Sequence, residues 1–186
     1  IFETETTSFN WQQGCRAQWI NKHQFIFNKA NNLQVVHNAI MVDLRNPQKP
    51  TVFNWPIDTT YGDNYYLSVN YRRLSAAHRE YGYHDLPPLS GGELENHSSD
   101  GIRKVDIKTK ESELIVPISR VISDSKSKVG KALHSLNHCS ISPTGEDFLF
   151  VHRYFVGSIR VDNLFCYNLR SDTLKPLCLH RMVSHY

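Results

Sequence analysis

The sequence predicts an all-β fold assembled from four-stranded antiparallel units that repeat along the chain. Short runs rich in Val, Ile, Phe and Tyr are separated by polar turns, which is the pattern of β-strands. No segment longer than about 12 residues carries apolar residues at helical spacing behind an N-cap, so helices are expected to be scarce. A strand–turn–strand pattern then recurs at nearly constant spacing, and this repeat decides the architecture.

Taken in chain order, eleven runs have the composition and length of strands. Turn residues such as Asn46 and Gly145 stand between them and end one run before the next begins. The expected strands cover residues 15–20, 23–29, 38–45, 51–57, 64–73, 102–109, 112–118, 138–142, 147–155, 163–170 and 174–179.

The repeat is clearest where a strand ends in Asp or Asn followed by an aliphatic residue and a polar turn. These positions are Asp43, Asp106 and Asn168, which lie 63 and 62 residues apart. A four-stranded antiparallel unit repeated along a chain is typical of β-propeller blades, although the usual repeat is about 40–45 residues. We therefore predict one propeller domain over residues 1–186, with blades at about 8–57, 58–120 and 134–180 and the start of another at 181–186.

Three blades do not close a ring, because closed propellers have about 4–8. Either the chain is a piece of a longer protein, or it closes as a homo-oligomer with another copy. The first is favoured, because the chain stops inside a strand-like run. The long segment 74–100 in the second blade is expected to be a functional or mobile loop.

The composition limits which partners and which cellular compartment are expected. The net charge of +3 is small and scattered, so nucleic acid is not an expected partner, and no apolar run approaches the roughly 18 residues of a membrane span. Cys15, Cys139, Cys166 and Cys178 form no C-x-x-C pair and read as buried free thiols, which favours the cytoplasm. Because the chain begins at Ile1, a removed signal peptide and a periplasmic location stay open.

Three stretches resemble a known group of proteins: "NWQQGCRAQW" (10–19), "YLSVNYRRL" leading to "YGYHDLP" (66–87), and "NHCSISPTGEDFLFVHRYF" leading to "MVSHY" (137–186). The chain is similar over about residues 8–186 to TolB-like, WD40-like bacterial β-propellers related to oligogalacturonate lyases, often encoded beside surface-polysaccharide genes. The resemblance implies a seven-bladed ring about twice this long. It also implies a divalent metal held largely by histidines in the central funnel, beside a catalytic base.

On that resemblance, His138 and His185 are candidate ligands for Mn²⁺, Fe²⁺ or Zn²⁺, since both are expected at strands lining the channel. His138 is also the candidate catalytic base, and Arg153 the candidate clamp for a uronate carboxylate. The alternatives are histidines that bond backbone carbonyls and an Arg153 paired with an acid such as Asp162. Missing blades leave the ligand set incomplete.

The second-blade loop "HREYGYHDLPP" places aromatic rings beside polar groups, which suits sugar binding. The alternative is a compact loop whose tyrosines pack on their own blade. Trp11, Trp19 and Trp55 read as packing residues. The candidate substrate-binding residues are Arg72, His78, Arg79, Tyr81, Tyr83, His84 and His152.

The predicted function is binding, with cleavage by metal-assisted β-elimination, of an acidic, uronate-containing oligosaccharide or polysaccharide in surface-glycan metabolism. Whether the chain is an enzyme is left open. A non-catalytic propeller that serves as a protein-interaction scaffold is the alternative, because propellers host both kinds of function.

Overall fold

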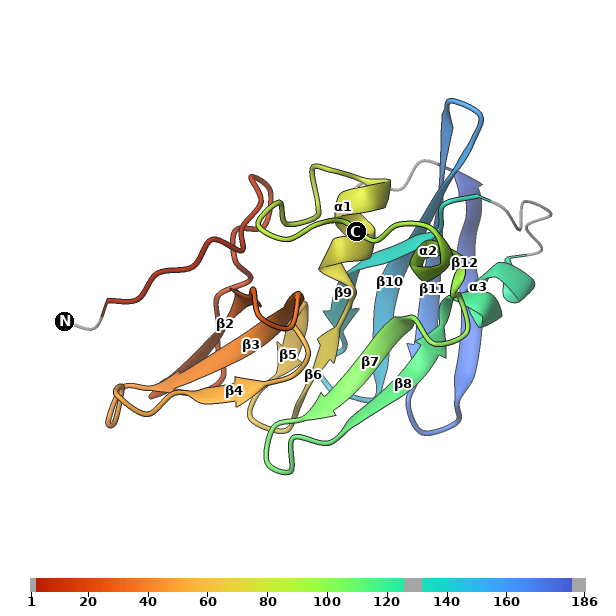
Figure 1. The fold of residues 1–186 in the computed structure, drawn as a ribbon. Helices are drawn as coiled ribbons and strands as arrows, with labels where there is room; N and C mark the ends of the chain where they lie inside the picture. The colour runs from red at the N-terminus through yellow and green to blue at the C-terminus, as the bar shows by residue number, and fades with distance from the viewer. Residues whose placement is uncertain (1–2, 126–131, 182–186) are drawn as a thin grey trace.

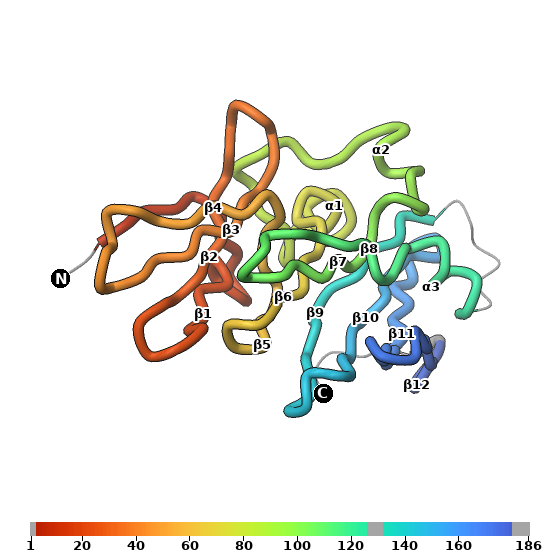
Figure 2. The backbone as a smooth tube through the Cα atoms, turned by 90° about the horizontal axis from the view of Figure 1, so that it is seen from below, coloured from red at the N-terminus to blue at the C-terminus, as the bar shows by residue number. Residues whose placement is uncertain are grey.

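The computed structural model describes residues 3–125 and 132–181, and it is an all-β structure (Figure 1). Its described strands form three four-stranded antiparallel sheets, as the repeat predicts. Viewed from below, the sheets follow one another along the chain from the red N-terminal part to the blue C-terminal part (Figure 2). Within each sheet the strand order follows the chain order, as in a blade.

The strands of each sheet have the following bounds. The first sheet contains β1 (Gln18–Trp19), β2 (Gln24–Asn31), β3 (Val36–Asp43) and β4 (Thr51–Phe53). The second contains β5 (Thr59–Tyr61), β6 (Tyr65–Ser68), β7 (Gly101–Asp106) and β8 (Ser112–Pro117). The third contains β9 (Ser135–Ile141), β10 (Asp147–Val156), β11 (Ile159–Asn168) and β12 (Thr173–Arg181).

Three short helices connect the strands: α1 (Tyr71–Ala77), α2 (Gly92–Glu95) and α3 (Ile118–Asp124). The predicted strand 64–73 is wrong at its end, because β6 stops at Ser68 and a helix follows. The reason is Asn70, whose side-chain oxygen accepts hydrogen bonds from the backbone N–H groups of Arg72 and Arg73 as an N-cap. None of the described helices is long and apolar enough to span a bilayer.

The repeated Asp or Asn residues close the turn after the third strand of each sheet. The side-chain oxygen of Asp43 accepts from the backbone N–H of Arg45 at 2.9 Å. Asp106 and Asn168 each accept from two backbone N–H groups, two and three residues further on. Side chains that bond to their own turn in this way favour tight connections, which explains why the repeat keeps Asp or Asn there.

The second sheet is buried on both faces, and adjacent tyrosines show how. Side chains alternate along a strand, so Tyr65 and Tyr66 point to opposite faces of β6. Tyr66 packs with Ile26 and Phe53 of the first sheet. Tyr65 packs in the larger cluster that contains Phe148 of the third sheet. Two hydrophobic cores therefore join the three sheets into one body.

A buried carboxylate, Asp58, lies where the three sheets meet. Its Oδ1 is 3.2 Å from the guanidinium of Arg16, which precedes β1, and accepts a hydrogen bond from the hydroxyl of Tyr71 at 3.1 Å. Its Oδ2 accepts from the backbone N–H of Cys139 in β9 at 2.8 Å. Asp58 is 1% exposed, so each of these bonds replaces water that the carboxylate has lost.

That backbone N–H is available because β9 contains a β-bulge. The pairing of β9 with β10 skips from Ser140 to Asn137, and His138 inside the irregularity has φ = 54°. A bulge leaves a residue outside the ladder and turns its side chain. The bulge therefore frees the Cys139 N–H for Asp58 and re-aims the ring of His138.

We predict that Asp58→Asn destabilises the fold by about 3 kcal/mol, because it leaves the Arg16 charge without its buried partner and removes an acceptor from the Cys139 N–H. Urea denaturation followed by circular dichroism measures the change. The matched control is Asp63→Asn in the exposed β5–β6 turn, which is expected to stay within about 0.5 kcal/mol of the parent. Equal stability of the two variants contradicts the role assigned to Asp58.

Candidate functional site

Three residues predicted for the site come together beside the β9 bulge. The ring of Tyr81 meets the ring of His138 edge to face at a centroid distance of 4.9 Å. The guanidinium carbon of Arg153 lies 4.6 Å from the centre of the Tyr81 ring. Gln13, from the N-terminal segment, lies 3.0 Å from His138 through its side-chain nitrogen and Nδ1. The predicted base, clamp and aromatic residue are therefore neighbours.

Arg153, however, is occupied by a protein partner. Its Nε donates to Oδ1 of Asp162 at 3.2 Å, and neither side chain has exposed surface. The two residues are directly opposite each other in β10 and β11. Asp162 also contacts Arg160 at 3.3 Å. To bind a uronate, Arg153 would have to leave a buried ion pair, which favours the internal pairing over the predicted carboxylate clamp.

His152 and His78 are also internal. His152 is fully buried, 2.9 Å from Nδ1 of His134 through Nε2 and 3.3 Å from the Asn163 amide through Nδ1. Burial, together with neighbouring His134, lowers the pKa of His152 to about 3. His78 stacks on Phe155 at 5.2 Å, and burial lowers its pKa to about 4. Both imidazoles are neutral at pH 7, and the position of His152 offers a ligand no surface.

Of the two predicted metal ligands, the structure describes His138 alone. No group of three or more His, Cys, Asp or Glu side chains gathers at metal-binding distance within residues 3–125 and 132–181. His138 uses Nδ1 toward Gln13. His185, the second predicted ligand, lies outside the described residues. We therefore assign no chemical step to a metal ion.

Three further predicted residues lie in the loop after α1, where one of them is buried and two are exposed. Tyr83 is 0% exposed, stacks on Tyr71 at 4.1 Å with rings 6° from parallel, and takes a hydrogen bond from Asn28 at 2.9 Å. It is thus a packing residue, as the alternative interpretation held. Arg79 and His84 are exposed, and His84 Nε2 lies 2.7 Å from the Arg79 carbonyl.

A cleft of about 470 Å³ lies between the first and second sheets, a volume typical of small-ligand sites. Of the residues predicted to bind substrate, Arg72 is the one that lines it. Trp55, expected to serve packing, keeps 36% exposure and lines the same cleft, so that interpretation was incomplete. The polar and aromatic side chains on the walls include His37, Asn54, Trp55, Asn70, Arg72 and Arg103.

Arg103 is the electrostatically distinctive residue of the cleft. Its guanidinium lies over the Trp55 ring at 4.0 Å from the centroid. No hydrogen bond or ion pair joins it to another residue in the described part of the chain. Burial lowers its pKa, and Asp100 only partly opposes this. The Asp100 carboxylate is already bound to Arg73 and Asn70, so the Arg103 charge lacks a direct counter-ion.

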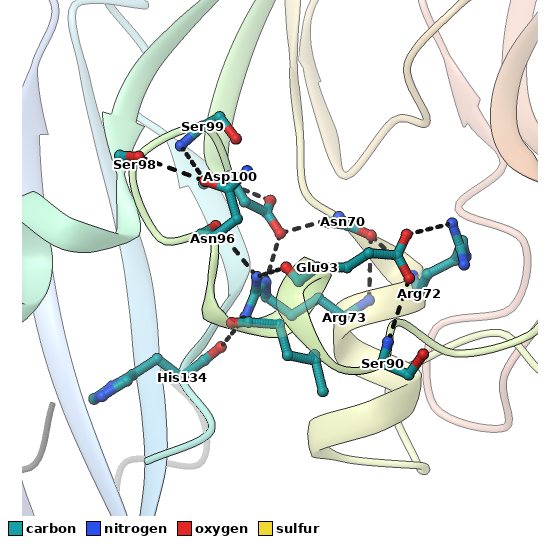
Figure 3. A network of polar contacts seen from close by, with 12 residues as sticks. Asn70, Arg72, Arg73, Ser90, Glu93, Asn96, Ser98, Ser99, Asp100 and His134 are labelled. Atoms are coloured by element: carbon teal, nitrogen blue, oxygen red, sulfur yellow. Dashed lines mark hydrogen bonds and ion pairs between the residues drawn. The ribbon is translucent and has the colours of Figure 1, made fainter. Parts of the chain in front are cut away.

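Arg73 holds in place the segment 93–100, which forms one wall of the cleft (Figure 3). It is 1% exposed and donates from Nε to Asp100 at 2.5 Å. Its other nitrogens donate to the carbonyls of Leu94 and Glu93 at 3.0 Å each, and to that of His134 at 3.3 Å. One guanidinium thus fixes the segment 93–100 against the third sheet.

Sequence reasoning missed His37, Trp55 and Arg103 as site residues, and no local signal marks them. They lie in β3, after β4 and in β7, and only sheet-to-sheet packing brings them to one cleft. Asn70 is an exception, because Asn is a common N-cap residue and its presence could have predicted that a helix begins after it.

No protein-family model matches this chain, and no curated protein matches it. The relation to lyase-type propellers therefore stays a hypothesis carried by the motifs quoted above.

We predict that Arg73→Gln releases the segment 93–100, because Gln cannot replace the hydrogen bonds that the guanidinium donates to Asp100 and to the carbonyls around it. Limited proteolysis is expected to cut this segment at least about 10-fold faster than in the parent, since cleavage follows the population of the opened segment. Arg79→Gln, at an exposed position of the same helix–loop unit, is the control. Unchanged cleavage in Arg73→Gln contradicts the role given to Arg73.

We predict that stability falls as the pH drops from about 6.5 toward 4, and that His152→Gln flattens this fall. Between the ordinary histidine pKa near 6.5 and the folded value near 3, only unfolded chains bind the proton, so acid favours unfolding. The effect per histidine is at most about 1.4 kcal/mol per pH unit. Urea denaturation at a series of pH values measures the slope in the parent and in the variant. A parental slope in His152→Gln would refute the assignment.

Proposed function

We propose that the chain is part of a β-propeller that binds an acidic, uronate-containing oligosaccharide or polysaccharide of surface-glycan metabolism, and that the site is the cleft between the first two sheets. The observation that carries the proposal is Arg103, a partly buried guanidinium stacked on Trp55 without a direct anionic partner among the described residues. A ligand carboxylate supplies the missing charge and matches the planar donor pattern of Arg.

The rest of the cleft suits a sugar. Arg72 adds a second cation whose acidic contact, Glu93, is distant at 3.5 Å. The side-chain amide of Asn54 provides a donor and an acceptor for hydroxyl groups, and the side-chain nitrogen of Asn96 provides a further donor. A hydrogen bond to a charged group contributes about 1.5–3 kcal/mol, so a carboxylate is worth roughly 10–100-fold in affinity over a neutral sugar.

We further propose that the three sheets are blades of a larger ring, completed by later blades to about seven or by a second copy of the chain. The first strands of the second and third sheets, β5 and β9, lie side by side, as innermost strands of neighbouring blades do (Figure 2). The order of strands within each sheet supports the same arrangement.

A protein-interaction scaffold is the second candidate, and the N-terminal segment favours it. Trp11 is 95% exposed and Phe9 is 51% exposed, and the two rings pack edge to face at 6.1 Å. Exposed aromatic residues are common at the centres of protein interfaces. Trp11 is therefore the residue to replace if the cleft proves inactive.

The test is calorimetric titration of the purified chain with oligogalacturonates and with neutral galactose oligomers of matching length. We expect the acidic oligomers to bind at least about 10-fold more tightly, and Arg103→Gln to lose roughly 10–100-fold of that affinity. The matched control is Arg170→Gln, which removes an arginine with a 79%-exposed side chain from the turn between β11 and β12 and is expected to bind as the parent does. Equal affinity for acidic and neutral oligomers, or full affinity in Arg103→Gln, overturns the proposal.

A further inference from the structure

The cleft contains a buried histidine–carboxylate pair. His37 in β3 lies 2.9 Å, through Nε2, from Oδ1 of Asp85 in the loop after α1. The other carboxylate oxygen of Asp85 accepts hydrogen bonds from the hydroxyls of Ser8 at 2.5 Å and Thr7 at 3.0 Å. The side chains of His37 and Asp85 are only 2% and 8% exposed. The carboxylate is thus fixed from two sides and holds the imidazole in one orientation.

Asp85 decides which ring nitrogen of His37 is available to a ligand. A carboxylate accepts hydrogen bonds, so Nε2 carries the proton and Nδ1 the lone pair. Nδ1 forms no hydrogen bond with a described residue, and it is not among the fully buried side-chain nitrogens without a partner. It therefore keeps contact with solvent, and the cleft is the space that His37 lines. The bond to Asp85 accounts for Nε2 and leaves Nδ1 facing that space as an acceptor.

The surroundings keep His37 neutral at pH 7, so the lone pair is present. Burial lowers the pKa of His37 below its usual value near 6.5, Asp85 opposes that effect and Arg72 of α1 adds to it. The other groups packed against the ring are Tyr83 and Tyr71, edge to face at 5.2 and 6.4 Å. A ligand that fills the cleft without a donor at this position leaves the lone pair buried and unpaired, which costs affinity.

The charges of the cleft determine which kind of donor fits. Arg72 and Arg103 line it beside the imidazole and disfavour an ammonium group, because like charges repel. Of the acids on its walls, Asp100 is bound to Arg73, and Glu93 contacts Arg72. The donor is therefore uncharged, and in a saccharide acid an uncharged donor is a ring hydroxyl.

We propose that His37 is a specificity-determining residue whose Nδ1 accepts a hydrogen bond from one ring hydroxyl of the ligand, so that the cleft selects saccharides in which this hydroxyl is free. The inference rests on the proposed binding of an acidic saccharide in the cleft. Sugars acylated or methylated on that oxygen lack the donor and add bulk, and they are rejected. Asp85 is a positioning residue, since it acts by holding the lone pair toward the ligand.

Nitrogen-15 NMR of the histidine-labelled chain near neutral pH tests the acceptor directly. The His37 resonances are those that disappear in His37→Gln. We expect Nε2 to be protonated and Nδ1 to be unprotonated. Adding methyl galacturonoside is expected to move the Nδ1 resonance upfield, because the lone pair then accepts a hydrogen bond. A histidine that only held the loop through Nε2 would show no such change at Nδ1.

The matched ligands are the three monodeoxy forms of the same galacturonoside, each lacking one ring hydroxyl, with affinities from NMR titration. We expect one of them to bind the parent roughly 5–100-fold more weakly than the complete sugar, since it leaves Nδ1 unpaired. In His37→Gln, whose amide can still donate to Asp85, the same two ligands are expected to bind within about 2-fold of each other. His23→Gln, in the turn before β2 and outside the cleft, is expected to keep the parental ratio.

The outcomes separate this inference from the proposed function, and thermal melting of each variant checks folding. A protonated Nδ1, or an Nδ1 resonance that the bound sugar does not move, overturns the inference from the parent chain alone. Equal affinity of the parent for all four galacturonosides, or the parental ratio in His37→Gln, overturns it too and leaves the binding proposal intact. A parent that binds neither the galacturonosides nor the oligogalacturonates overturns both.

Discussion

The arrangement of the three sheets depends on one buried carboxylate. Asp58 binds a guanidinium from before the first sheet, the hydroxyl of Tyr71 from α1 and a backbone N–H from the third sheet. A buried carboxylate is costly unless donors surround it, so the position of each donor is constrained by the other two. The bulge at His138 belongs to this constraint, because it supplies the N–H of Cys139 from inside a strand.

The buried arginines and the cleft arginine have different roles for the same electrostatic reason. Arg73 and Arg153 are buried beside Asp100 and Asp162, and their charges are spent on holding segments of the protein together. Arg103 is only half-buried, with an aromatic ring rather than an acid beneath it. All three arginines lie in strands or helices, so what distinguishes Arg103 is its neighbour, which is an aromatic ring where the other two have a carboxylate. A charge that the fold does not neutralise is the one available to a ligand.

The sequence predicted the features that local chemistry determines. The alternating strands, the four-stranded units and the Asp or Asn turns all arise from residues close together in the chain, and the all-β prediction is confirmed. The site depends on distant partners. The sequence does not reveal that Asp162 lies opposite Arg153, so it could not show that Arg153 forms a buried ion pair. It likewise does not reveal that His134 lies against His152 inside the protein. Likewise, the convergence of His37 and Arg103 follows from packing between sheets, which no short motif records.

The bonding of Asp85 has an evolutionary consequence. Its carboxylate connects Thr7 and Ser8, near the beginning of the chain, with His37 in the first sheet, so residues remote in sequence share one hydrogen-bond network. None of the four can change polarity without leaving another unsatisfied or misoriented. Selection therefore acts on them jointly, and in homologous chains these positions are expected to covary as a group. Substitutions in the N-terminal segment are therefore expected to accompany substitutions at His37 of the cleft, although that segment lies outside all three sheets.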